Sequence, residues 1–186
     1  METDWEVFKQ KKTELLEEKL KAFISRLEKI RSNRIVLEVI EREINLKLTE
    51  GKNPTKPAAS LSISPNHELV VSNFEPKKTS LITNIVLQLG YNKLEEKSSK
   101  EKLYFVLSIM TKEKRDKCIQ ESKKIAEEGK KSFGLVHQDL KRWLKKEKSL
   151  SQDQKKSCEK QSDKLEKDYR EKLMTAREKK EKELSS

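Results

Sequence analysis

The chain has 186 residues, of which 40% are charged and only 5% are aromatic, so its hydrophobic core must be small. Lys and Arg total 43 against 32 Asp and Glu, and the formal net charge of +11 favours a polyanionic partner, either nucleic acid or an anionic membrane surface. The N-terminal residues contain no apolar signal region, and no run of 18 apolar residues occurs. We therefore expect a soluble, cytoplasmic protein.

Residues 4–30 are predicted to form one long helix, because their apolar residues recur at the spacing of a single helix face. These residues are Trp5, Phe8, Leu16, Leu20, Phe23, Leu27 and Ile30. Their regular spacing also argues against a disordered chain, despite the high charge. Asn33 can adopt the left-handed conformation that ends a helix, so the helix is expected to end near Ser32 and Asn33.

The pattern changes between residues 35 and 109, where all four prolines of the chain are found. Ile44, Leu46 and Leu48 alternate with polar residues, which predicts a half-buried strand. Further strands are predicted over residues 61–63, 68–74 and 103–109, together with a helix over 78–89 that stops at Gly90. This stretch is therefore expected to form a small α/β domain.

The helical period returns at Thr111, which is expected to cap a helix that reaches about residue 147. Its predicted inward face consists of Cys118, Ser122, Ile125, Gly129, Phe133, Val136, Leu140 and Trp143. Ser151 and Gln154 have the spacing of a capping box, which predicts the start of a last helix that runs to about Leu184. The inward residues of that helix are Cys158, Leu165, Tyr169, Leu173 and Ala176. Both cysteines are predicted to be reduced and buried.

None of these three long helices can bury its apolar face alone, and the short connection near residue 150 makes the last two antiparallel neighbours. The predicted fold class is therefore α+β, with a three-helix bundle formed by residues 1–31 and 110–186. An α/β domain, residues 32–109, is inserted into it. Because the chain crosses between the two domains twice, a two-stranded hinge is predicted at Ser32, Asn33, Met110 and Thr111.

Several strings resemble, in order and spacing, those of the bacterial ribosome recycling factor family. KIRSNR at residues 29–34 resembles the family's KIRTGR, and ASLSI at 59–63 resembles LASVTV. MTKEKR at 110–115 is similar to LTEERR, and LSQD at 150–153 is similar to ISED. The resemblance covers nearly the whole chain, and the combination of strings is more specific than any one of them.

The resemblance implies an L-shaped monomer whose bundle lies on large-subunit ribosomal RNA of the 23S type after termination. Elongation factor G with GTP would then drive separation of the ribosomal subunits. The family has no active site of its own, so we expect no enzyme and no cofactor. Two alternatives remain open: a coiled-coil-like scaffold protein, which would self-associate, and a generic basic RNA-binding protein.

The charge pattern and the resemblance together suggest RNA contacts at Arg31, Arg34, Arg115, Lys123, Lys130, His137 and Lys141. The last four share one side of a helix, although a run of lysines on a helix is usually only a solvated face. Gly134 stands where the resemblance implies an RNA-contacting arginine, and His137-Gln138 replace a double arginine. One hypothesis is that lysines elsewhere compensate, in which case Gly134→Arg should tighten binding to the large subunit.

The sequence contains no pattern that predicts catalysis or metal binding. Two histidines and two distant cysteines do not make a zinc site. Phosphate-binding, dinucleotide-binding and nucleophile-elbow glycine motifs are all absent from the sequence. Adjacent carboxylates such as Glu127 and Glu128 lie on predicted solvated helix faces, where acid–base catalysis is rare.

Overall fold

In the computed structural model, residues 3–31, 34–49 and 57–185 are described, and they form two compact units. Unit 1 consists of Met1–Glu28 and Lys117–Ser185, and unit 2 consists of Lys29–Asp116. Unit 2 is thus inserted into unit 1 in the sequence.

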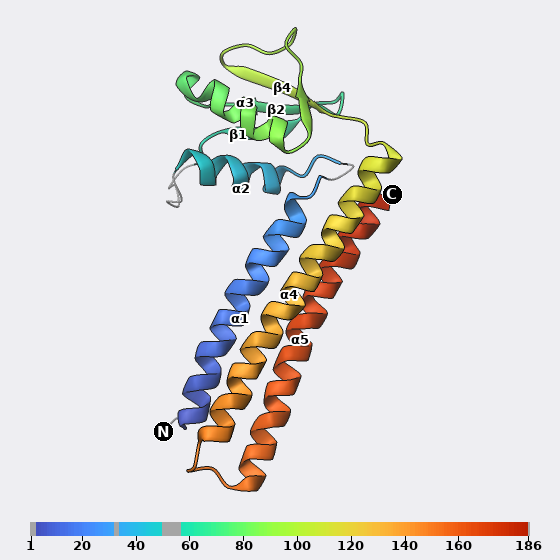
Figure 1. Ribbon diagram of the computed structural model, residues 1–186. Coiled ribbons are helices and arrows are strands. Elements are labelled where there is room, and N and C mark those ends of the chain that lie inside the picture. Colours follow the sequence, from blue (N-terminus) through green and yellow to red (C-terminus); the bar gives the residue numbers. More distant parts are fainter. Residues whose placement is uncertain (1–2, 32–33, 50–56, 186) are drawn as a thin grey trace. The chain divides into compact units, whose positions relative to one another are not determined.

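Unit 1 is built from three long helices, α1 (Asp4–Lys29), α4 (Lys112–Lys146) and α5 (Gln152–Ser185). They lie side by side, with α4 antiparallel to the other two (Figure 1). One end of the bundle buries Trp5, Leu140, Leu144 and Cys158 together. Phe8 stacks on Trp143 in the same cluster, with ring centroids 5.2 Å apart. The predicted three-helix bundle is confirmed.

The starts of α4 and α5 have the side-chain caps that the sequence predicts. The Lys114 backbone N–H donates to Thr111 Oγ1 over 3.3 Å. At the turn before α5, the Ser151 N–H donates to Gln154 Oε1 over 2.8 Å, and the Gln154 N–H donates to Ser151 Oγ over 3.2 Å. This reciprocal pair is a capping box, and it satisfies two backbone donors that the helix start would otherwise leave unpaired.

Unit 2 is a four-stranded antiparallel sheet with two helices. The strands are β1 (Ser60–Ile63), β2 (Leu69–Ser72), β3 (Tyr91–Lys93) and β4 (Lys102–Leu107), in the order β1-β2-β4-β3. Helix α2 (Leu37–Leu48) and helix α3 (Thr79–Gln88), which a 3-10 turn (Pro76–Lys78) precedes, pack with the sheet around one core. That core includes Ile40, Ile44, Leu69, Val71, Ile82, Val86, Leu103 and Phe105. The predicted α/β domain and the predicted fold class are confirmed.

Two local predictions were wrong, and one strand was missed. The strand predicted at Ile44, Leu46 and Leu48 is the end of helix α2. Ile40, Ile44 and Leu48 follow a helical spacing of four, whereas Arg42 interrupts a period of two. Ile40 and Ile44 are each 1% exposed, whereas Leu46 is 47% exposed, as a helix requires.

Strand β3 was missed because it has three residues and a single apolar side chain, that of Tyr91. Cys118 was predicted to be buried, but it is only half-buried, whereas Cys158 is buried as predicted. Both cysteines are free thiols.

Two glycines of α4 have different surroundings. An ideal Cβ built on Gly129 would overlap Leu173 Cδ2 and would meet the Phe23 ring at 3.4 Å. Leu173 is fully buried, so its side chain has little room to move aside. At Gly134 the nearest atom to an ideal Cβ is Arg170 Nη2 at 3.5 Å, an ordinary contact distance. Gly129 is therefore required by close helix packing, whereas Gly134 is not.

This difference predicts opposite effects for the same substitution. Gly129→Ala should lower the free energy of unfolding by about 1–3 kcal/mol, because the added methyl overpacks the core. Gly134→Ala should raise it by up to about 1 kcal/mol, because alanine is the better helix former and meets no obstacle. Urea unfolding followed by circular dichroism measures both, and changes of the same sign would contradict the packing described here.

Candidate nucleic-acid interface

Helices α4 and α5 are joined on one side by a chain of alternating charges. From α4, Lys141 Nζ lies 3.3 Å from Asp163 Oδ1, and His137 Nε2 lies 2.8 Å from the same oxygen. His137 Nδ1 lies 2.9 Å from Glu166 Oε2, and Arg170 Nη2 lies 2.6 Å from Glu166 Oε1. These five side chains, which we call the α4–α5 charge chain, meet because residues three or four apart share a helix face.

The charge chain lowers the pKa of Asp163 and so favours its ionised carboxylate. The hydrogen bond from His137 holds the pKa of Asp163 below its usual value. Burial opposes this effect, and Lys141 adds to it. Both ring nitrogens of His137 face carboxylate oxygens.

Four of the predicted RNA contacts lie on the part of α4 that belongs to unit 1, and three of them have a carboxylate partner. His137 and Lys141 belong to the charge chain, and Lys130 Nζ lies 3.1 Å from Glu127 Oε1. Lys123 is exposed and has no ion pair within the described part of the chain. The predicted stripe therefore exists as a set of neighbouring positions, but it is not a surface of unpaired cations.

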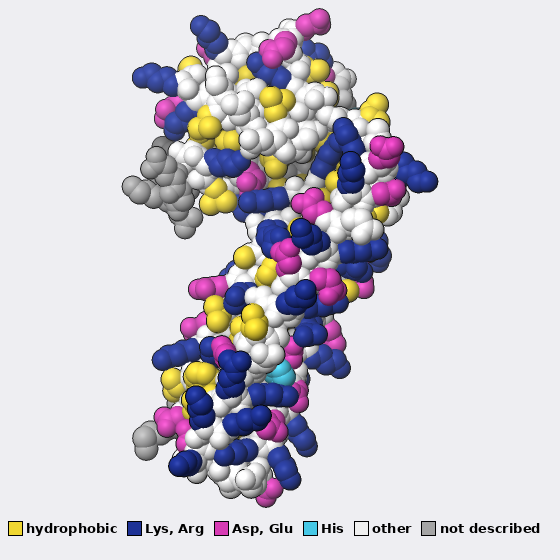
Figure 2. All heavy atoms as spheres, viewed as in Figure 1, with side chains coloured by type: hydrophobic (Ala, Val, Ile, Leu, Met, Phe, Trp, Pro, Cys, Tyr) yellow, Lys and Arg dark blue, Asp and Glu magenta, His cyan; other side chains and the backbone are white. Residues whose placement is uncertain are grey.

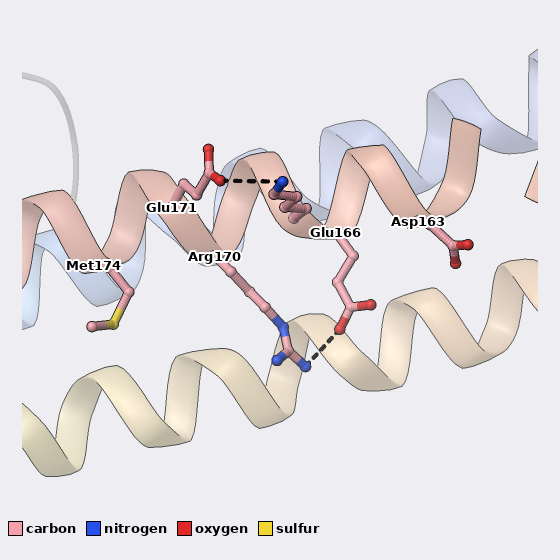
Figure 3. Close-up of a pocket in the computed structure, with 6 residues that line it drawn as sticks. Asp163, Glu166, Arg170, Glu171 and Met174 are labelled. Atoms are coloured by element: carbon pink, nitrogen blue, oxygen red, sulfur yellow. Dashed lines mark ion pairs between the residues drawn. The ribbon is translucent and has the colours of Figure 1, made fainter. Parts of the chain in front are cut away.

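A groove of about 510 Å³ lies beside these positions, lined from α4 by Lys130, Lys131, Gly134, Leu135 and Gln138 and from α5 by Arg170. A second groove of about 310 Å³ is lined only by residues of α5, namely Asp163, Glu166, Lys167, Arg170, Glu171 and Met174. Figure 3 shows Glu166 and Arg170 reaching from α5 towards α4, while Glu171 points away. Arg170 is the one residue that lines both grooves.

Sequence reasoning missed Asp163, Glu166 and Arg170. They lie on α5, and the charge pattern of α5 alone gives no sign of which charges face α4. Gly134 was the available signal, because a glycine within a helix leaves room for a side chain from a neighbouring element. Arg170 borders that room, and its Nη2 lies 3.5 Å from where a Cβ of Gly134 would be.

The other predicted site residues lie in unit 2. Arg31 is half-buried against Gly90, because an ideal Cβ at Gly90 would lie only 2.9 Å from Arg31 Cδ. Gly90 has a φ of +92°, so glycine suits this turn both for its backbone conformation and for the close approach. Nε and Nη2 of Arg31 are buried without a hydrogen-bond partner among the described residues.

Arg34 is exposed, and Arg115 is half-buried. Of the predicted hinge residues, Met110 is half-buried and Thr111 is exposed, while Ser32 and Asn33 lie outside the described residues. In the described ranges, no group of three or more His, Cys, Asp and Glu side chains could hold a metal ion. No helix described here is long and apolar enough to span a membrane.

The sequence profile of the ribosome recycling factor family matches residues 23–184. The chain belongs to this family. A ribosome-recycling factor of Mycoplasmoides gallisepticum is 27% identical to it over 164 residues, which cover 88% of each chain.

Two solved structures of ribosome recycling factors share this fold. The solution structure of a ribosome recycling factor matches with a TM-score of 0.77 and 20% identity, over 100% of this chain and 99% of the other. The T. thermophilus ribosome recycling factor, described with E. coli elongation factor G bound to the E. coli post-termination complex, matches with a TM-score of 0.62. It is 20% identical, and the match covers 99% of this chain and 100% of that one. At this identity the two likenesses establish the fold.

The charge chain predicts a pH effect at Asp163. In His137→Ala the pKa of Asp163 should rise towards its usual value, because the hydrogen bond that lowers it is lost. A lowered carboxyl pKa stabilises the folded state above the unfolded value of about 3.9. That stability is lost as the pH falls from about 3.9 through the lower pKa of the folded state. His137→Ala should therefore be less stable than the wild type above about pH 3.9, and this difference should disappear below the folded pKa.

Carbon-13 NMR titration of the Asp163 carboxyl measures the pKa, and urea unfolding at several pH values measures the stability. His67→Asn, at the other histidine of the chain, is the control, because His67 is exposed, lies in unit 2 and has a φ of +59°, which asparagine tolerates. An Asp163 pKa that does not change in His137→Ala would contradict the described contact.

Proposed function

We propose that this protein recycles ribosomes after translation termination, by binding large-subunit ribosomal RNA and separating the subunits together with elongation factor G and GTP. The observation that carries the proposal is the family match over residues 23–184, which includes the last two turns of α1, all of α2, α3, α4 and the four strands, and α5 except its last residue. The ribosome and elongation factor G are proposed as partners because a relative of the same fold is described with both. We expect it to act as a monomer in the cytoplasm.

Electrostatic attraction to RNA phosphates would supply much of the binding free energy. Residues 111–186 contain 24 Lys and Arg against 16 Asp and Glu, a net charge of +8. Figure 2 shows Lys and Arg side chains spread over the visible face of the bundle, with Asp and Glu among them. Lysine greatly outnumbers arginine, which suits attraction to phosphates better than recognition of individual bases.

The predicted contacts remain proposed RNA contacts, but they differ in how easily they could be made. Lys123 is exposed and needs no rearrangement. Lys130, His137 and Lys141 would exchange a carboxylate for a phosphate. Arg31 would have to turn its guanidinium outwards or bind through Nη1, because Nε and Nη2 are buried. The protein would contribute binding and rigid helices, and elongation factor G would contribute GTP hydrolysis.

The bundle gives little support to a self-associating scaffold. Trp5, Leu140 and Leu144 bury one another within a single chain. Among the described residues of unit 1, the exposed large hydrophobic side chains are Val7 at 39% and Leu135 at 63%. Two separate residues do not form the continuous apolar seam that a coiled-coil partner requires.

The first test is subunit splitting. Purified protein is mixed with post-termination ribosomes, elongation factor G and GTP, and subunit dissociation is followed by light scattering. We expect scattering to fall only when protein, factor and GTP are all present, with GDP as the control nucleotide. Failure with ribosomes and factor from the source organism, by a folded monomer, would overturn the proposal.

A second prediction concerns salt. The logarithm of the binding constant for the large subunit should fall linearly with the logarithm of salt concentration, because bound phosphates release counterions. Lys123→Ala should reduce the slope by about one, as expected for one lost phosphate contact. Lys141→Ala should reduce it by less, because Lys141 already pairs with Asp163 at 3.3 Å. Equal slopes for wild type and Lys123→Ala would remove Lys123 from the interface.

A further inference from the structure

The groove between α4 and α5 has a lining suited to an anion. Lys130, Lys131 and Arg170 contribute three positive charges to its lining, and the two carboxylates that pair with them, Glu127 and Glu166, are not lining residues. The groove on the other side of Arg170 differs, because three of its six lining residues are Asp163, Glu166 and Glu171. An anion near Arg170 would therefore be attracted into the first groove and repelled from the second.

Arg170 is held so that part of its guanidinium stays available. Its Nη2 pairs with Glu166 Oε1 at 2.6 Å, and Glu166 Oε2 is in turn 2.9 Å from His137 Nδ1. The Glu166 side chain is 16% exposed, whereas that of Arg170 is 44% exposed. A guanidinium has five N–H donors, and the ion pair uses one end of the group. The remaining donors can pair with two phosphate oxygens, which is the geometry that arginine favours.

Gly134 leaves the floor of this groove open. An ideal Cβ there would lie 3.5 Å from Arg170 Nη2 and 3.7 Å from Glu166 Oε1. A methyl group would just touch these atoms, and any longer side chain would occupy the space beside the guanidinium. The helix gains nothing from a glycine at this position, since alanine is the better helix former. The glycine therefore leaves the Arg170 guanidinium accessible from the groove.

We infer that Arg170 of α5, together with Lys130 and Lys131 of α4, forms a binding site for a backbone phosphate of the ribosomal RNA. This inference rests on the proposed function and adds to it a residue, on a different helix, that the sequence pattern did not indicate. Glu166 is a positioning residue that fixes the guanidinium. RNA is favoured over a flat anionic membrane because carboxylates of Asp163 and Glu171 flank Arg170 on the other side. Separate phosphates of a strand can avoid them, whereas a continuous anionic surface cannot.

The test compares charge-matched variants on one helix. Arg170→Gln removes the proposed contact, and Lys167→Gln, one turn earlier on α5, is the control. Lys167 lines only the second groove and lies 3.9 Å from Glu171. Affinity for isolated large ribosomal subunits is measured at several salt concentrations by fluorescence anisotropy, after circular dichroism has confirmed folding. We expect Arg170→Gln to weaken binding roughly tenfold and to lower the salt slope by about one. Lys167→Gln should stay within about twofold of the wild type.

Gly134→Leu separates a defined site from general charge. It leaves every charge in place but fills the floor of the groove, so it should weaken binding as Arg170→Gln does. Arg170→Lys keeps the charge and loses the two-donor geometry, so its affinity should be intermediate.

The outcomes are distinguishable from failure of the proposed function. If the wild type binds large subunits and splits ribosomes, but Arg170→Gln and Gly134→Leu bind equally well, the inference is overturned and the proposed function stands. Binding to phosphatidylglycerol vesicles that depends on Arg170, without binding to large subunits, would overturn both. Weaker subunit binding by both variants, with Lys167→Gln unaffected, would support the site.

Discussion

The contact between Phe133 and Tyr169 determines how α4 and α5 lie against each other. The two rings meet edge to face with centroids 6.1 Å apart, and Phe133 is fully buried. On its other side Phe133 meets Phe23 of α1, also at 6.1 Å, so one side chain contacts both neighbouring helices. Large aromatic side chains bury the most surface, and this chain has few of them. Their positions therefore fix the register of the bundle.

That register also determines the surface chemistry. Gly134 follows Phe133 in α4, and Arg170 follows Tyr169 in α5. When the two rings meet in the core, the next residue of each helix is brought towards the same surface groove. The Tyr169 hydroxyl adds to the fixed position by donating to Glu17 Oε2 over 2.8 Å. Burial and this hydrogen bond raise the pKa of Tyr169 to about 12, so the hydroxyl stays protonated above the pH at which an ordinary tyrosine ionises.

Most of the fold was predictable because each long helix carries its own apolar pattern over many turns. Five or more inward positions in each long segment give a signal that one exception does not change. The errors fell where the window was short: residues 44–48 fit two periods at once, and β3 has three residues. Candidate RNA contacts could be assigned to a side of α4 for the same reason. Their partners could not, because Asp163 and Glu166 face α4 only when the two helices have packed against each other.

The pairing of charges also changes what the net charge of +11 means for binding. Cations packed closely on a helix repel one another, and carboxylates between them reduce that repulsion. Asp163 contacts both His137 and Lys141, and Glu166 contacts both His137 and Arg170, so two acids hold three basic side chains together. The same carboxylates compete with a phosphate for those side chains.

A surface of this kind holds its basic groups in place before binding, at the cost of part of their attraction for RNA. The balance between a fixed position and free hydrogen-bond donors differs from residue to residue along the charge chain. His137 uses both nitrogens on carboxylates, and so has least to offer a phosphate. Arg170 uses one end of a five-donor group and keeps the rest. The position of a basic residue in the charge chain, rather than its charge alone, therefore decides whether it can serve as an RNA contact.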